Sequence, residues 1–112
     1  MERRATAEED LFEARLQLGD HQSLLADLRP AVEAEPLRQR RWGQLMLALQ
    51  RCGQQTEALG SFQRLRNVLD EHGTEPSAAL SELDRAIALD RSDLAWTAPT
   101  KAGEVPAQVI SA

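Results

Sequence analysis

Two glycines, Gly19 and Gly53, lie 34 residues apart, and this spacing constrains the fold of the chain more than any other feature. The same displacement superposes apolar residues on apolar residues, namely Leu11 on Leu45, Leu25 on Leu59 and Leu28 on Phe62. A period of 34 residues is typical of helix-turn-helix repeats, which stack and bury their apolar faces against one another. We therefore expect an array of helices whose free surface binds another protein.

Size and composition agree with one small domain and exclude several classes of protein. The chain has 112 residues, 42% of them hydrophobic, and a net charge of −5, which argues against an electrostatic surface for nucleic acid or anionic lipid. Cys52 is the single cysteine, so neither an internal disulfide nor a zinc cluster is expected. No apolar run reaches the 18 or so residues that span a bilayer. We expect a cytoplasmic protein that neither enters a membrane nor binds a cofactor or metal.

The first helix is predicted from a capping-box pattern, in which Thr6 is followed three residues later by Glu9. Apolar residues then recur at helical spacing until Gly19, and these are Leu11, Ala14 and Leu18. Residues 1–6 are therefore expected to be a flexible N-terminal stump. The three apolar side chains are expected to face the core.

Four further helices are predicted between glycines and prolines. The second helix, with Asp20 as its N-cap, should run to about Pro36 and be kinked or broken at Pro30, which lacks an amide proton. The next two are expected at about 37–52 and 56–72, and the last follows an N-cap at Ser77. The helical domain is expected at residues 7–90. Residues 91–112 lack helical periodicity and are interpreted as a linker or C-terminal tail.

The second hairpin matches the tetratricopeptide pattern, which requires an aromatic residue, a leucine, a small residue and a second aromatic residue at fixed positions. In this chain these residues are Trp42, Leu45, Ala58 and Phe62. The first hairpin keeps only the register, because Glu8 and Leu24 replace the aromatic and the small residue. The predicted fold is all-α, with two tetratricopeptide-like hairpins and a fifth helix in a right-handed superhelical array.

A more particular resemblance lies between residues 35 and 87. Its motifs are Pro36-Leu37-Arg38, Leu45-Met46-Leu47-Ala48-Leu49, Arg51 with Gly53, Glu57-Ala58-Leu59, Leu65-Arg66, and Gly73 with Glu75-Pro76. With these motifs the chain resembles the bacterial transcriptional activator domain, the tetratricopeptide-like region of actinobacterial antibiotic-regulatory (SARP-type) regulators. The likeness covers roughly residues 7 to 96.

The resemblance implies a non-catalytic module that mediates protein–protein interaction or oligomerisation within a transcriptional regulator. Its partners would be a second copy or other domains of the same regulator. In the family a winged helix-turn-helix that binds DNA usually precedes this domain. The 112 residues contain no winged helix-turn-helix. We therefore expect any contact with DNA to depend on such a domain. No catalytic motif or phosphate-binding loop is present, which agrees with a protein that is not an enzyme.

Arginines are concentrated in the middle of the chain. Residues 36–66 contain six arginines and one acid, Glu57, for a net charge of +5, which leaves −10 for the remainder. The candidates for partner binding are Arg38, Arg41, Arg51 and Arg64. They could form a docking face for an acidic or phosphorylated peptide on a stand-alone adaptor, or simply a solvated helical surface. Direct DNA binding by this basic band is a third alternative, and its affinity would fall steeply with salt.

Overall fold

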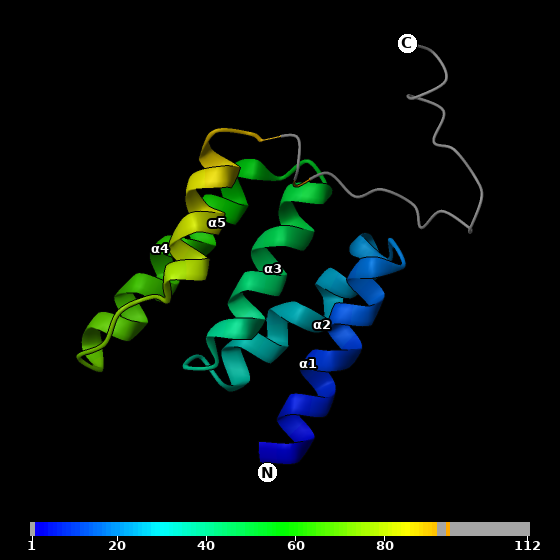
Figure 1. Ribbon diagram of the computed structural model, residues 1–112. Coiled ribbons are helices and arrows are strands. Elements are labelled where there is room, and N and C mark those ends of the chain that lie inside the picture. Colours follow the sequence, from blue (N-terminus) through cyan, green and yellow to red (C-terminus); the bar gives the residue numbers. More distant parts are fainter. Residues whose placement is uncertain (1, 92–93, 95–112) are drawn as a thin grey trace.

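The computed structural model describes residues 2–91 and 94, so most of the predicted linker or tail at 91–112 lies outside the described residues. Five helices account for most of this part of the chain, and it contains no strand, which confirms the predicted all-α class (Figure 1). The helices are α1 (Glu2–Gln17), α2 (His21–Ala34), α3 (Gln39–Arg51), α4 (Gln55–Glu71) and α5 (Ala78–Ala88). None of these helices is both long enough and apolar enough to cross a bilayer.

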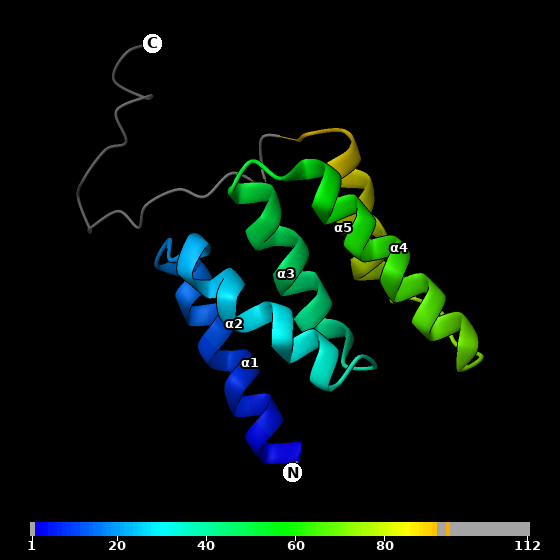
Figure 2. The ribbon, with the colours of Figure 1, turned by 180° about the vertical axis from the view of Figure 1, so that it is seen from behind.

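The helices form two layers, and α3 lies at the centre of the array. Figures 1 and 2 show α1, α3 and α5 in one layer and α2 and α4 in the other, with α3 between the α1–α2 hairpin and the α4–α5 pair. Helix α3 contacts all four other helices, and it is therefore buried on more than one face. Its fully buried apolar side chains are Trp42, Leu45, Met46, Ala48 and Leu49. The predicted hairpins and fifth helix are therefore present, with the core centred on α3.

The 34-residue period reflects two equivalent helix ends. Gly19 has a φ of +86° and Gly53 a φ of +78°, the left-handed conformation that glycine adopts without steric cost. At the second end the Gly53 amide donates to the carbonyl oxygen of Gln50 at 3.0 Å, and the Gln54 amide donates to that of Leu49 at 2.9 Å. This pair of hydrogen bonds is a Schellman motif, and the same pair follows α1.

The start and the buried face of α1 differ from the prediction. The helix begins at Glu2, so residues 2–6 belong to it, and Thr6 lies inside the helix instead of capping it. Leu11 and Leu18 are 58% and 72% exposed, and Ala14 is exposed as well. The face of α1 that packs inward consists of Ala5, Glu9, Phe12 and Leu16. Helix α1 carries two apolar stripes, and among the described residues only one of them is buried.

Three predicted helix signals have different outcomes. Asp20 precedes α2, but its side chain makes no capping hydrogen bond, because its carboxylate accepts one from Arg15 Nε at 2.9 Å. Pro30 does not break α2, which continues to Ala34 along a curved course (Figure 2). Ser77 caps α5 as predicted, since its Oγ accepts a hydrogen bond from the Leu80 amide at 3.2 Å.

Replacing Gly53 by valine tests this description of the helix end. We expect Gly53→Val to lower the free energy of unfolding by more than about 1 kcal/mol, because a β-branched residue is disfavoured at positive φ. No atom lies within 4 Å of the added Cβ, so backbone strain would be the cause. Urea denaturation followed by circular dichroism measures the change.

Gly60 is the matched control, because it lies inside α4 and its added Cβ also meets no atom within 4 Å. There Gly60→Ala should raise stability by about 0.5 to 1 kcal/mol, since alanine favours the helix. A Gly53→Val protein as stable as the unmodified chain would contradict the proposed helix end.

Candidate functional site

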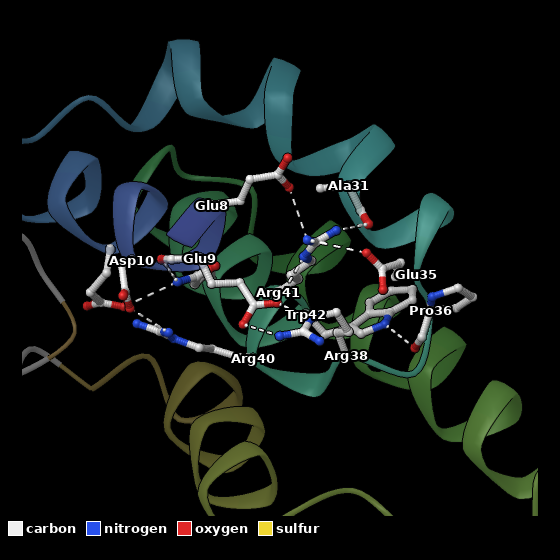
Figure 3. A network of polar contacts seen from close by, with 12 residues as sticks. Glu8, Glu9, Asp10, Ala31, Glu35, Pro36, Arg38, Arg40, Arg41 and Trp42 are labelled. Atoms are coloured by element: carbon white, nitrogen blue, oxygen red, sulfur yellow. Dashed lines mark hydrogen bonds and ion pairs between the residues drawn. The ribbon is translucent and has the colours of Figure 1, made fainter. Parts of the chain in front are cut away.

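Arg41, one of the four arginines predicted to bind a partner, is buried where three helices meet. It lies in the first turn of α3 and is only 2% exposed. Its Nε donates to Glu9 Oε2 at 3.0 Å and its Nη2 to Glu8 Oε1 at 3.0 Å, both on α1 (Figure 3). Its Nη1 donates to the Ala31 carbonyl oxygen of α2 at 3.1 Å, and the Glu35 carboxylate lies 3.6 Å away. Arg41 therefore holds α1 and α2 against α3.

Two neighbouring arginines extend this arrangement along α1. Arg38 Nη2 donates to Glu9 Oε1 at 3.2 Å, so both oxygens of the buried Glu9 carboxylate are paired. Arg40 Nη1 donates to Asp10 Oδ1 at 2.8 Å at the exposed edge (Figure 3). We refer to the whole set as the α1–α3 ionic cluster, and its members are Glu8, Glu9, Asp10, Glu35, Arg38, Arg40 and Arg41.

Glu9 remains ionised at neutral pH within this cluster. Burial alone would raise the pKa of its carboxyl group, because a charge is poorly solvated inside a protein. The hydrogen bonds and charges of Arg38 and Arg41 outweigh burial and hold the pKa of Glu9 below its ordinary value. The ion pairs of Glu9 with Arg38 and Arg41 are thus structural contacts that join α1 to α3.

The other two predicted arginines lie elsewhere. Arg51 Nε donates to the Leu94 carbonyl oxygen at 2.9 Å and its Nη1 to that of Leu16 at 3.5 Å, and burial lowers the pKa of its guanidinium. Arg64 is exposed on α4, where it pairs with Glu33 and lies 5.3 Å from the centre of the Trp42 ring. The four arginines therefore do not form one surface. Each already has an acidic, carbonyl or aromatic partner within the chain.

An apolar groove, which the sequence analysis did not identify, runs between α1, α3 and α5. Its volume is about 420 Å³, and its apolar lining consists of Leu16, Gly43, Leu47, Ala79, Leu80 and Leu83. Gly43 lies where α3 packs against α5, and a Cβ added there would stand 2.8 Å from Leu80 Cδ2. A glycine inside an otherwise regular helix is the one sequence signal of this close contact.

Polar side chains of α3 hold the two walls of this groove. Gln39 Oε1 accepts a hydrogen bond from the Ser77 amide at 2.7 Å, and its Nε2 donates to the Glu75 carbonyl oxygen at 3.3 Å. These bonds attach the segment before α5, whereas Arg40 attaches α1 through Asp10. Contacts to both walls of the groove therefore come from two adjacent residues of α3.

Nothing in the described part of the chain resembles a metal centre, since no group of three or more histidine, cysteine, aspartate or glutamate side chains is placed to hold an ion. Cys52 is partly buried, and burial raises the pKa of its thiol, which leaves the thiolate poorly populated at neutral pH. The apolar lining of the groove favours apolar side chains as ligands.

Comparisons with known proteins give a consistent result. The family model described as "Bacterial transcriptional activator domain" matches residues 1–88. The chain is 42% identical over 77 residues to the regulatory protein DnrI of Streptomyces peucetius, covering 68% of this chain and 28% of DnrI. It is 41% identical over 80 residues to the transcriptional regulator RedD of Streptomyces coelicolor, covering 70% of this chain and 23% of RedD. The chain thus spans less than a third of either relative.

A solved structure has the same fold. The structure of Mycobacterium tuberculosis EmbR in complex with a low affinity phosphopeptide aligns with a TM-score of 0.77 and 26% sequence identity. The alignment covers 90% of this chain and 25% of EmbR. This similarity supports the helical-repeat architecture.

The role of the Glu9 carboxylate can be tested by Glu9→Gln. This change leaves Arg41 buried with less compensating charge, and we expect a loss of roughly 3 kcal/mol of stability at pH 7. The native pKa of Glu9 is depressed, so its contribution is present above the unfolded-state pKa and is lost as pH falls through the folded-state pKa. The unmodified protein should therefore lose more stability than Glu9→Gln between about pH 5 and pH 3.

Asp10→Asn is the matched control, because it breaks an ion pair whose two side chains are both exposed. Its effect at pH 7 should stay below about 1 kcal/mol. Urea denaturation at several pH values measures all three proteins. Equal losses for Glu9→Gln and Asp10→Asn would contradict a special role for the buried pair.

Proposed function

The chain belongs to the bacterial transcriptional activator domain family, and from this premise we propose that it is a non-catalytic protein-binding module of a cytoplasmic transcriptional regulator. Its partner would be another domain of the same regulator or a second copy. DNA would be contacted by a separate winged helix-turn-helix domain. The observation that carries the proposal is the apolar groove between α1, α3 and α5, which offers leucine side chains on an open face of the array.

The groove has the properties of a preformed protein-binding site. Leu47 and Leu83 are only partly buried, so part of each side chain remains available to a ligand. The hydrogen bonds of Gln39 hold the α5 wall, and the buried pair of Glu9 with Arg41 holds the α1 wall before a partner arrives. Such preorganisation favours binding because less conformational freedom is lost in the complex. An apolar face of a partner helix is the ligand that best matches this lining.

A second candidate ligand is an acidic or phosphorylated peptide. It is favoured by a separate cleft of about 320 Å³ between α2 and α4, which is lined in part by Arg29, Ser61 and Arg64. EmbR was solved with a phosphopeptide, although this chain covers only a quarter of that protein. The arginines of the cleft already pair with Glu57 and Glu33, so the peptide would have to displace these carboxylates. We therefore favour the groove.

The groove can be tested in a chimeric regulator in which this chain replaces the corresponding part of DnrI. We expect Leu47→Glu to reduce the output of a DnrI-controlled reporter at least about tenfold, because a carboxylate would be desolvated in the apolar groove. Leu89→Glu is the matched control, since Leu89 is exposed and is not part of the groove lining. Both variants should be expressed equally and remain helical. Full reporter output from Leu47→Glu would contradict the proposal.

The second candidate has its own test with a polyglutamate peptide as the probe. Binding that weakens with salt and is lost in Arg64→Gln would support it, because a screened ion pair would carry the affinity. Fluorescence anisotropy of a labelled peptide measures this. The absence of binding at low ionic strength would exclude an acidic-peptide site.

A further inference from the structure

The chain that follows α5 runs back across the end of α3 toward α1. Gln50 Nε2 donates a hydrogen bond to Asp90 Oδ1 at 2.9 Å, and Arg51 Nε donates to the Leu94 carbonyl oxygen at 2.9 Å. The same guanidinium donates through Nη1 to the Leu16 carbonyl oxygen at 3.5 Å, and Leu16 lines the apolar groove. Leu94 therefore lies at one end of this groove, where α1 and α3 both end.

The position of Leu94 restricts where the next residues can go. Its side chain is partly buried and packs against the hydrophobic core. Two further residues add at most about 7 Å of chain, so Trp96 must begin close to the same end of the groove. Residues two apart in an extended segment face the same side. An extended continuation would thus direct Trp96, like Leu94, toward the core and the groove.

The segment after Leu94 matches the groove in polarity and in length. Residues 95–100, which lie outside the described residues, read Ala-Trp-Thr-Ala-Pro-Thr and carry no charge. Six extended residues span about 20 Å, and α3, which runs along the groove, also rises by about 20 Å over its 13 residues. The far end of the groove lies where Gln39 binds the Ser77 amide. The segment is therefore long enough to follow the whole groove.

We propose that residues 95–100 occupy the apolar groove as an internal ligand, with Trp96 as the anchor. The groove has a volume of about 420 Å³, within the range of about 300 to 1,000 Å³ that is typical of ligand sites, and it can take one indole among small side chains. A partner has to displace this segment. Its occupancy regulates the proposed function, on which the inference rests, because the apparent affinity of a partner falls with the fraction of open grooves.

Disulfide trapping tests the position of the segment, in a Cys52→Ser background that removes the native thiol. Thr100→Cys combined with Ala79→Cys should form an intramolecular disulfide in the full chain, because Ala79 lines the groove at the start of α5. The matched control combines Thr100→Cys with Ala78→Cys, since Ala78 is also exposed but is not part of the lining. Its yield should be several-fold lower. Equal yields, disulfides between chains, or no disulfide in either protein would overturn the inference.

Acrylamide quenching of tryptophan fluorescence tests the anchor. Trp42 is only 1% exposed, so a change in quenching reports on Trp96. Leu47→Glu should raise the quenching constant at least about twofold, because a carboxylate in the apolar lining disfavours the indole. Leu89→Glu is the matched control, since Leu89 is exposed outside the lining, and it should leave quenching unchanged. Circular dichroism should show that both variants stay helical. Equal quenching in all three proteins would overturn the inference.

The DnrI chimera separates this inference from the proposed function. Trp96→Ala should raise reporter output several-fold, because an open groove binds the partner more tightly. Val109→Ala, an apolar substitution beyond the segment, should leave output unchanged. Unchanged output from Trp96→Ala, with output lost in Leu47→Glu, would overturn only the internal ligand. A trapped disulfide together with full output from Leu47→Glu would overturn only the groove as the functional site.

Discussion

The buried ion pair between Glu9 and Arg41 determines how the N-terminal helix is placed. A charged guanidinium inside a protein requires several acceptors, and Arg41 obtains them from α1 and α2 at once. With Glu9 directed inward, Leu11 is turned by about 200° around the helix and must face outward. The orientation of α1, and with it one wall of the groove, therefore depends on this ionic contact together with the burial of Phe12 and Leu16. Such a pair provides specificity of packing more than net stability.

Charge patterns along the sequence did not predict charge patterns in space. The arginines between residues 36 and 66 suggest an exposed basic band, yet the acids that pair with them come largely from α1 and α2. Glu9 pairs with Arg38 and Arg41, which are 29 and 32 residues away in the sequence. Because the hairpins stack, the acidic first repeat neutralises the basic second one. The use of the arginines as a docking face stays a prediction, and any acidic ligand would compete with these internal partners.

The exposed apolar surfaces of the described residues have two different origins. Helix α3 contacts all four other helices and buries residues on several faces. Helix α1 has the same periodic pattern but lacks one neighbour among the described residues, so an apolar stripe remains exposed. The groove has a different origin, since Gly43 and Gln39 bring α5 against α3 while α1 forms the opposite wall. A domain of this kind can thus offer two distinct surfaces.

Sequence patterns predict the helices, their order and the equivalent glycine ends, because helix termination depends on local backbone conformation and on periodicity within about four turns. The placement of Trp42, Ala58 and Phe62 in the core followed from the same local register. The rotation of α1, the pairing of the arginines and the position of the groove arise only from contacts between helices. These features depend on contacts between residues about 30 or more positions apart, such as Glu9 with Arg41 and Gly43 with Leu80. Local periodicity predicted a core face of Leu11, Ala14 and Leu18, whereas packing buried the other face of α1, with Phe12 and Leu16.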